Sequence, residues 1–357
     1  MGKNKKMSTD NTPLRLGLVG LRFGAGLAQK QIFGNPENQK YVRITKVCDR
    51  IKEKADAYGA RNNVPVCYDL EDLLKDPEID GIMLMIPPGN RAELIKKCVD
   101  AGKHILTTKP FELDPAAAEE ALLYAREKGI IVHLNSPGPM PSCDLQQIRL
   151  WQQKYDLGQV VSAHWETYAK YNEQADGSWF DSYDACPAAP IFRLGIYGIN
   201  ELVAIMGKVD SVEVVTTHIA TGRPTPDNAQ LMIRFQNGAI GSIYAALCIG
   251  DGVYYPAGMT LHFQNGTIWK RQVRTLKDAD FTKVELELRV VVDGEVVEER
   301  AEVPAVNRSG AYQYAQFAQS VREGYRAESL IFAEEWMSYG YVLTDMGNEY
   351  VQIYAKQ

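Results

Sequence analysis

The sequence lacks the signals of several protein classes. Its six cysteines are scattered and form no CxxC pair, and its five histidines form no HxH or HxxxH pair. A disulfide framework and a metal site therefore have little support, and a reduced, cytoplasmic setting fits best. No apolar run approaches the ~18 residues that a membrane span requires, so we expect no membrane partner. The polar, lysine-containing start does not read as a secretory signal.

The chain also has no excess of positive charge. Its 39 Lys and Arg residues face 45 Asp and Glu residues, which gives a formal net charge of −6. Nucleic-acid binding depends on cations that neutralise phosphates, so we expect no nucleic-acid partner. A 45% hydrophobic composition is ordinary for a globular protein, and 357 residues predict two domains.

Two parts of the chain differ in hydrophobic pattern. From Pro13 to about Pro137, short runs that are apolar throughout alternate with helix-like segments, as is typical of parallel strands covered on both faces. After the proline-rich segment 136–141, strand-like runs between about 209 and 303 are separated by hairpin signals at 236–238, 264–266 and 293–294.

This pattern predicts an α/β fold. We expect an N-terminal Rossmann domain with a parallel sheet in residues 13–137. We expect a C-terminal α+β domain with a mostly antiparallel open sheet in residues 138–357, closed by helices near 312–323 and 333–354.

The first predicted strand leads into a glycine-rich turn, Gly20-Leu21-Arg22-Phe23-Gly24-Ala25-Gly26. Such a turn before a helix lets the backbone approach a pyrophosphate closely, and the helix N-terminus offers N–H groups to it. The spacing departs from G-x-G-x-x-G, because Arg22 and Ala25 stand at the later glycine positions if Gly20 is the first. A tight turn of an ordinary α/β protein is the alternative.

An acidic residue, Asp49, ends the second predicted strand. It lies roughly 20 residues beyond the turn, as expected for the acid that binds the adenosine ribose. Asp49 would repel a 2′-phosphate and favour NAD, whereas the adjacent Arg50 suits the phosphate of NADP. NAD is the expected cofactor and NADP the alternative; a simple helix cap is the structural alternative for Asp49.

Two further segments carry a family resemblance. Residues 86–91 read Ile-Pro-Pro-Gly-Asn-Arg, and residues 101–110 read Ala-Gly-Lys-His-Ile-Leu-Thr-Thr-Lys-Pro. They resemble the TPN-x-x-H and AGKHVLxEKP motifs of the glucose–fructose oxidoreductase/inositol dehydrogenase/rhizopine catabolism (Gfo/Idh/MocA) family, and the resemblance covers nearly the whole chain. It implies an NAD(P)-dependent oxidoreductase that transfers hydride between nicotinamide and a hydroxyl or carbonyl of a sugar, polyol or sugar acid.

The resemblance also implies a cofactor site. It places Lys109 beside the nicotinamide, where a partly buried amine can polarise a carbonyl or assist proton transfer. Asn135 matches a family asparagine near the ring, and Thr108 stands where the family usually has glutamate. The predicted cofactor-binding residues are Gly20, Leu21, Arg22, Phe23, Gly24, Asp49, Arg50, Pro87, Pro88, Asn90, Thr108, Lys109 and Asn135.

A second catalytic element of the family reads D-x-G-x-H, where this chain has Arg193-Leu194-Gly195-Ile196-Tyr197. Tyr197 replaces the histidine, as in the glucose–fructose oxidoreductase and dihydrodiol dehydrogenase branches, and the resemblance implies that it donates and accepts the proton. A nearby lysine stabilises a phenolate, so Lys109 and Tyr197 form the predicted catalytic pair. The alternative for Tyr197 is a half-buried packing role.

Arg193 replaces an acid of the motif, and we hypothesise that it binds a substrate carboxylate or phosphate. The alternative is that it pairs with Asp181 or Asp184 in the preceding loop. Trp179, Asp181 and Asn200 complete the predicted substrate site with Arg193; an aromatic plug between the domains is equally compatible with the loop sequence.

Other functions stay open at this point. Tightly held NAD could support redox-neutral epimerisation or elimination on a sugar. The loss of the usual Asp and His could instead mark a regulatory protein that binds the dinucleotide without turnover. An open sheet face needs cover, so a homodimer or homotetramer is expected.

Overall fold

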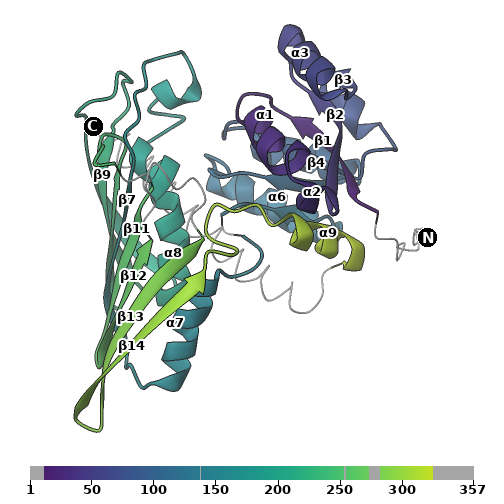
Figure 1. Cartoon of the computed structure of the whole chain (residues 1–357). Coiled ribbons are helices and arrows are strands. Elements are labelled where there is room, and N and C mark those ends of the chain that lie inside the picture. The colour runs from purple at the N-terminus through teal and green to yellow at the C-terminus, as the bar shows by residue number, and fades with distance from the viewer. Residues whose placement is uncertain (1–11, 137, 253–254, 273–281, 325–357) are drawn as a thin grey trace. The chain divides into compact units, whose positions relative to one another are not determined.

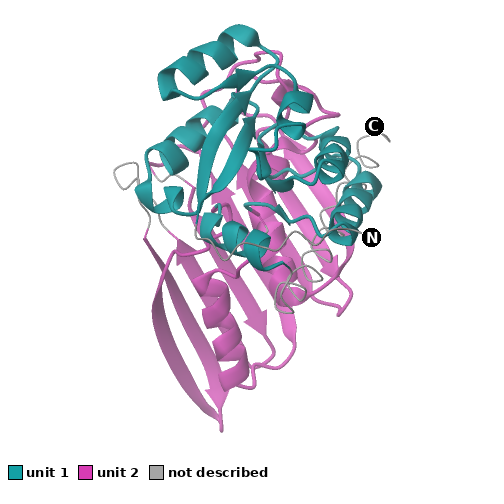
Figure 2. Cartoon of the chain, turned by 90° about the vertical axis from the view of Figure 1, so that its right-hand side faces the viewer, with its two compact units in different colours: residues 1–135, 312–337 teal, residues 136–311, 338–357 magenta. Residues whose placement is uncertain are grey.

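The computed structural model describes residues 12–324 apart from 137, 253–254 and 273–281. The helix expected near 333–354 lies outside these residues. The described residues form two compact units, one of residues 12–135 with 312–324 and one of residues 136–311 (Figure 2).

The first unit contains a six-stranded parallel sheet (Figure 1). Its strands are β1 (Leu14–Val19), β2 (Val42–Cys48), β3 (Val66–Cys67), β4 (Gly81–Leu84), β5 (His104–Thr107) and β6 (Val132–His133). The strand order is β3-β2-β1-β4-β5-β6, the Rossmann arrangement in which the order reverses between β1 and β4. All four residues of β4 are buried, because helices cover both faces of the sheet. The predicted parallel Rossmann sheet is confirmed.

Short helices connect these strands. They are α1 (Phe23–Ala28), which continues as the π-helix η1 (Gln29–Phe33), then α2 (Pro36–Gln39), α3 (Lys52–Asn62), α4 (Leu70–Leu74), α5 (Arg91–Asp100) and α6 (Pro115–Glu127). Local sequence explains α6 well: Asp114 accepts a bond from the backbone N–H of Ala117, and Pro115 occupies the first turn.

One helix of the first unit comes from the far end of the described chain. In α9 (Tyr314–Glu323), Tyr314, Phe317 and Ala318 are buried in the same apolar cluster as Leu16 and Leu18 of β1. The first compact unit ends at Asn135 and includes α9, whereas the sequence pattern predicted a boundary near 137 and placed all later residues in the second domain. The apolar face of this helix is buried against the Rossmann sheet instead.

The second unit contains an eight-stranded sheet in the order β14-β13-β12-β11-β7-β10-β9-β8. Its strands are β7 (Val160–Tyr168), β8 (Val209–Thr217), β9 (Asn228–Phe235), β10 (Ile240–Ala246), β11 (Ala257–Phe263), β12 (Gly266–Gln272), β13 (Lys283–Val292) and β14 (Glu295–Pro304). All neighbouring pairs are antiparallel except β7 with β10, so the expected mostly antiparallel sheet is confirmed.

The three predicted hairpin turns join consecutive strands of this sheet. Between β13 and β14, Asp293 and Gly294 have φ values of 52° and 86°. Positive φ at both central residues is the conformation that a two-residue hairpin with an Asp-Gly turn adopts.

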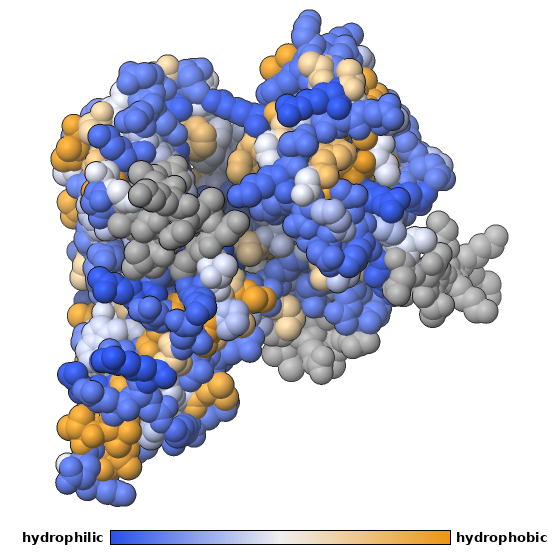
Figure 3. Space-filling model, viewed as in Figure 1, coloured by the Kyte–Doolittle hydropathy of each residue, from blue (hydrophilic) through white to orange (hydrophobic). Residues whose placement is uncertain are grey.

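Two long helices, α7 (Cys143–Lys154) and α8 (Ile196–Met206), pack on one face of the sheet (Figure 1). The 3₁₀ turn η2 (Trp179–Asp181) and the π-helix η3 (Ile191–Gly195) lie on the path from β7 to α8. Side chains such as Val215, Met232 and Ile240 are exposed on the sheet strands. Figure 3 also shows an apolar patch at the tip of the β13–β14 hairpin, where Val291 and Val296 are exposed.

Candidate active site

The turn after β1 requires its first glycine. Gly20 has a φ of +89°, and a Cβ atom there would lie 2.4 Å from the carbonyl oxygen of Met85. Gly24 is buried, and its Cβ would come within 2.9 Å of the Met85 side chain. A Cβ at Gly26 would meet nothing within 4 Å. Within the described chain, no side chain caps α1 at its N-cap residue, Arg22. The turn thus has the close packing and open helix start that suit a pyrophosphate.

Asp49 ties this turn to the end of β2. Its carboxylate accepts a bond from the N–H of Leu21 at 2.9 Å and one from the N–H of Ile51 at 3.0 Å. The second bond lies at the start of α3, so Asp49 also acts much like the helix cap that the sequence analysis gave as its structural alternative. Each carboxylate oxygen keeps further acceptor capacity for a ribose hydroxyl. Phe23 and Arg50, also predicted to contact the cofactor, are exposed.

The turn after β4 carries three predicted cofactor residues. Pro87 and Asn90 are exposed, whereas Pro88 is buried. Asn90 is the N-cap residue of α5, although its side chain makes no capping bond. These residues therefore follow the carboxyl end of β4, next to β1 in the sheet, the position at which open α/β sheets bind ligands.

Three of the predicted residues meet after β5 and β6. The Oδ1 atom of Asn135, a side chain only 3% exposed, accepts a bond from the N–H of Lys109 at 3.1 Å and one from the Thr108 hydroxyl at 3.4 Å. Because β5 and β6 are adjacent and parallel, their carboxyl ends bring these residues together. The backbone that carries the Lys109 side chain is thus bonded to Asn135, which follows the neighbouring strand.

In the second unit, Tyr197 lies in the first turn of α8 and is partly buried. Gly310, with a φ of +92°, packs against its phenol: a Cβ at 310 would lie 3.2 Å from Cε1 and 3.4 Å from the hydroxyl oxygen of Tyr197. No local pattern in the sequence indicates this contact, because Gly310 and Tyr197 lie 113 positions apart.

Asn200 lies on the same helix, one turn further on. Its Nδ2 donates to the Ser136 hydroxyl at 2.7 Å, and Ser136 bonds the Ser309 hydroxyl at 3.0 Å. In the described structure its Oδ1 is buried without a hydrogen-bond partner. A buried amide oxygen of this kind is an acceptor that a ligand hydroxyl can use.

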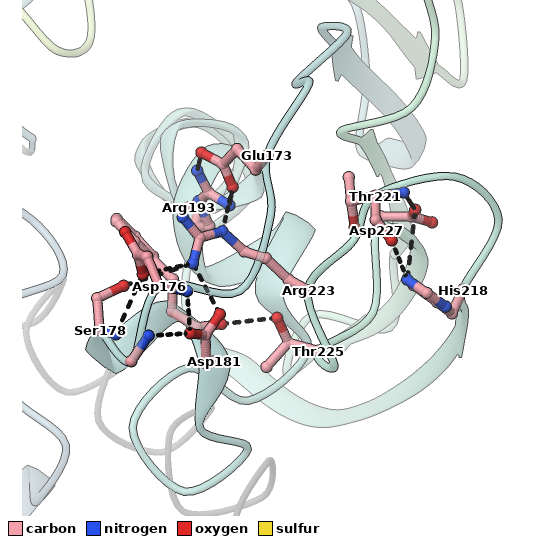
Figure 4. Close-up of polar contacts among 12 residues, drawn as sticks. Glu173, Asp176, Ser178, Asp181, Arg193, His218, Thr221, Arg223, Thr225 and Asp227 are labelled. Atoms are coloured by element: carbon pink, nitrogen blue, oxygen red, sulfur yellow. Dashed lines mark hydrogen bonds and ion pairs between the residues drawn. The ribbon is translucent and has the colours of Figure 1, made fainter.

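Arg193 makes a bidentate ion pair with Glu173, with both N–O distances at 2.8 Å (Figure 4). Its guanidinium also lies 4.2 Å from the ring centre of Phe180 and 4.8 Å from that of Tyr171. A pair with Asp181 or Asp184 was the alternative to substrate binding in the sequence analysis, whereas the structure pairs Arg193 with Glu173. A substrate carboxylate would have to displace Glu173 from this fork.

Asp181 pairs with a second cation, Arg223, at 2.7 Å (Figure 4). Arg223 also bonds Glu173 at 2.6 Å and Asp176 at 2.9 Å. Burial would raise the pKa values of both Glu173 and Asp181, but hydrogen bonds outweigh it. The pKa of Glu173 is lowered by Arg193 and Arg223, and the pKa of Asp181 is lowered by Arg223 and by the N–H groups of Asp176 and Gly177. We call Glu173, Asp176, Asp181, Arg193 and Arg223 the loop ion cluster.

The loop ion cluster fixes the segment that carries Trp179, whose ring lies against that of Phe180 with the centroids 4.2 Å apart and the planes tilted by 34°. Sequence reasoning missed Glu173 and Arg223, which lie 20 and 30 residues from Arg193. No spacing rule links an ion pair across such loops.

Among the described residues, no group of His, Cys, Asp and Glu side chains could hold a metal ion, and no helix is long and apolar enough to cross a membrane.

Comparison with protein families defines the class. Residues 14–136 match the model described as "Oxidoreductase family, NAD-binding Rossmann fold". Residues 145–295 match the GFO/IDH/MocA C-terminal domain. The fold and both matches define an oxidoreductase with an NAD-binding Rossmann domain. The chain belongs to the Gfo/Idh/MocA family, as the resemblance predicted.

Individual relatives are more distant. A dTDP-3,4-didehydro-2,6-dideoxy-alpha-D-glucose 3-reductase from Saccharopolyspora spinosa is 28% identical over 123 residues, which cover 34% of this chain and 36% of that protein. The chain thus matches well under half of this relative's length.

Solved structures share the whole fold. A 3-ketoreductase from Actinomadura kijaniata in complex with NADP and TDP-benzene has a TM-score of 0.69 at 19% identity, covering 93% of this chain and 96% of that one. A levoglucosan dehydrogenase in complex with NADH has a TM-score of 0.68 at 18% identity, covering 96% and 97%. These likenesses show the fold.

Proposed function

We propose that the chain transfers hydride between a nicotinamide cofactor and a hydroxyl or carbonyl group of a sugar or polyol, with Lys109 and Tyr197 handling the proton. The observation that carries the proposal is the bonding of the Lys109 backbone to the buried Asn135, at the carboxyl ends of two Rossmann strands. Relatives that reduce a deoxysugar or oxidise levoglucosan support the substrate class.

The cofactor supplies a carbon that accepts or donates hydride when it is bound. The turn at Gly20–Gly24 would hold its pyrophosphate, and Asp49 would accept bonds from its adenosine ribose. A carboxylate at this position repels a 2′-phosphate, so we propose NAD as the preferred cofactor. NADP remains the alternative, because Arg50 is exposed beside Asp49.

The two units contribute different groups to the proton transfer. In the reductive direction, the Lys109 ammonium polarises the substrate carbonyl and the Tyr197 phenol gives its proton to the oxygen as hydride reaches the carbon. In the oxidative direction, the Tyr197 phenolate, stabilised by the Lys109 ammonium, takes up the hydroxyl proton and becomes the neutral phenol. In this proposal, both residues act on the reacting oxygen.

The substrate itself would bind to the second unit. The Asn200 Oδ1 accepts a bond from a substrate hydroxyl, and the Trp179 ring offers a face to a sugar. Asp181 and Arg193 would hold the loop that carries Trp179 rather than contact the substrate themselves, because their charges are paired within the loop ion cluster. This favours neutral sugars over sugar acids.

We also propose a homodimer or homotetramer built on the open face of the second sheet, working in the cytoplasm, where the six free cysteines stay reduced. Light scattering of the purified chain tests the assembly: a monomer at micromolar concentration would contradict it.

The test of the function is a substrate panel. The full chain is incubated with NAD(H) and NADP(H) and with neutral sugars, polyols and sugar acids, while reduced nicotinamide is followed by absorbance and products by chromatography. We expect net oxidation or reduction of a neutral sugar or polyol. Unchanged nicotinamide with an epimerised or dehydrated product would establish redox-neutral chemistry instead. Tight cofactor binding without any product would establish a regulatory protein.

A further inference from the structure

Arg91, the first residue of α5, is a cation with no exposed surface. Its Nη1 donates to the carbonyl oxygens of Thr108 at 2.5 Å and Phe111 at 2.9 Å and to that of Pro110, and its Nη2 donates to that of Ile86. These acceptors belong to two separate turns, one after β4 and one after β5. Burial lowers the pKa of Arg91 to about 10, so the side chain is still charged at neutral pH.

Glu112 makes the reverse connection. Its Oε1 accepts a bond from the N–H of Gly89 at 2.6 Å, and its Oε2 accepts one from the N–H of Ala92 at 2.8 Å. Arg91 thus reaches from the first turn to carbonyls of the second, and Glu112 reaches from the second turn to N–H groups of the first. We call these two side chains the turn clamp.

The turn clamp holds the backbone on both sides of Lys109. The carbonyls of Thr108 and Pro110, its two neighbours, both accept from a single nitrogen of Arg91. The N–H of Lys109 itself donates to Asn135, which follows β6, the strand adjacent and parallel to β5. With its backbone fixed in this way, the long Lys109 side chain starts from a defined point, which narrows the positions that its amine can take.

We propose that Arg91 and Glu112 are positioning residues that aim Lys109 at the reacting oxygen. The inference rests on the proposed catalytic role of Lys109. Neither side chain is assigned to the cofactor or the substrate: Arg91 is enclosed by carbonyls, and Glu112 is engaged by N–H groups. Their contribution is therefore expected in kcat, with little change in the affinity for NADH.

The chain offers a matched control in Lys103. This cation is also buried, at 7% exposure, and it also donates to two backbone carbonyls, those of Asp76 and Ile79, at 2.7 Å each. It lies at the opposite end of β5, before His104. Arg91→Met and Lys103→Met thus both remove a buried clamp from the same unit, and only the first touches the Lys109 turn.

The experiment measures hydrogen exchange and kinetics of the full-length variants at a temperature where each is folded. We expect Arg91→Met to speed exchange in residues 108–113 and to lower kcat at least ~10-fold, with NADH affinity within about threefold. Arg91→Lys keeps the charge but not the planar donor groups of the guanidinium, so its kcat and its exchange rates should lie between those of wild type and Arg91→Met. Lys103→Met should leave kcat and exchange at 108–113 within about twofold.

A wild-type kcat in Arg91→Met, or equal losses of kcat in Arg91→Met and Lys103→Met, would overturn the positioning role. Unchanged exchange at 108–113 would overturn the clamp itself, and this arm needs no substrate. Failure of the wild-type chain to turn over any substrate would refute the proposed function and is therefore read separately. If Arg91→Met does not fold, Arg91→Lys and Glu112→Gln carry the same comparison.

Discussion

The two units hold their candidate residues by different means. In the first unit, the groups around Lys109 are largely backbone atoms: carbonyls that accept from Arg91, N–H groups that donate to Glu112, and the N–H that donates to Asn135. In the second unit, the loop before α8 is held by charged side chains, with Arg193 on Glu173 and Arg223 on three carboxylates. Backbone atoms do not change with substitution, whereas ion partners do. The first arrangement therefore tolerates substitution of the residues that are contacted, whereas the second depends on the identity of each charged partner.

The largest expected effect is at the centre of the backbone-held site. Lys109→Met removes the amine but keeps the bonds of its backbone to Asn135. We expect kcat to fall about 10³-fold, the usual scale for one general acid–base group, with NADH affinity nearly unchanged. Steady-state kinetics and a fluorescence titration of NADH measure the two. A kcat within tenfold of wild type would remove Lys109 from the chemistry.

The next effect tests the side-chain-held loop. Arg193→Met leaves Glu173 beside Arg223 alone and removes a cation packed on Phe180. Because Glu173 is partly exposed, we expect the free energy of unfolding to fall by about 2–3 kcal/mol. This is at or below the range for breaking a fully buried ion pair. Urea unfolding measures the loss, and the KM for substrate should rise while NADH affinity stays constant.

Arg289 provides the control for Arg193. Its pair with Glu298 is about half exposed on both sides, so Arg289→Met should cost below about 1 kcal/mol. Equal losses in the two variants would mean that the loop ion cluster contributes no more than a surface pair.

A smaller difference is expected in acid. Burial lowers the pKa of His104 to about 4 and that of His133 to about 3, both in the first unit. Unfolding therefore takes up protons below about pH 6.5, and the first unit should progressively lose stability as the pH falls from about 6.5 towards 4. The lowered pKa values of Glu173 and Asp181 act differently, because their contribution is lost only below the ordinary carboxyl range.

Hydrogen exchange read separately for each unit between pH 7 and pH 4.5 measures this difference. His133→Phe, which places an apolar ring against Phe317, should flatten the pH dependence of the first unit. Earlier loss of protection in the loop ion cluster than in the Rossmann sheet would contradict the assignment.

The smallest expected effect concerns the choice of cofactor. Asp49→Ser removes the charge that would repel a 2′-phosphate while keeping a hydroxyl near the N–H groups of Leu21 and Ile51. We expect the ratio of kcat/KM for NADPH to that for NADH to rise about tenfold, the scale of one charge–charge contact. An unchanged ratio would mean that Asp49 serves the turn alone.

The same contrast explains what could be predicted from the sequence. The Rossmann sheet and the hairpin turns follow from local patterns. Thr108, Lys109 and Asn135 were singled out by the family resemblance, and they meet because parallel strands bring their carboxyl ends to one edge. The partner of Arg193 could not be predicted, since Glu173 lies in an irregular loop with no periodicity. The packing of α9 on the first unit could not be predicted either, because the pattern of an amphipathic helix does not indicate which of two sheets its apolar face covers.

Arg91 is an intermediate case. It stands within a motif that sequence reasoning had already singled out, but a charged residue at the start of a helix is ordinarily exposed. Its guanidinium is enclosed by carbonyls only because the turns after β4 and β5 fold against each other, and this contact is visible in the structure alone.

A double-mutant cycle tests the central proposal, that one amine and one phenol act on the same oxygen, most directly. Lys109→Met, Tyr197→Phe and the double variant are compared in kcat/KM on the substrate found by the panel. We predict that the double variant is hardly slower than the slower single variant, because groups that act as a unit are strongly non-additive. Losses that multiply would show that the two residues act independently, and the proposed proton transfer would then be wrong.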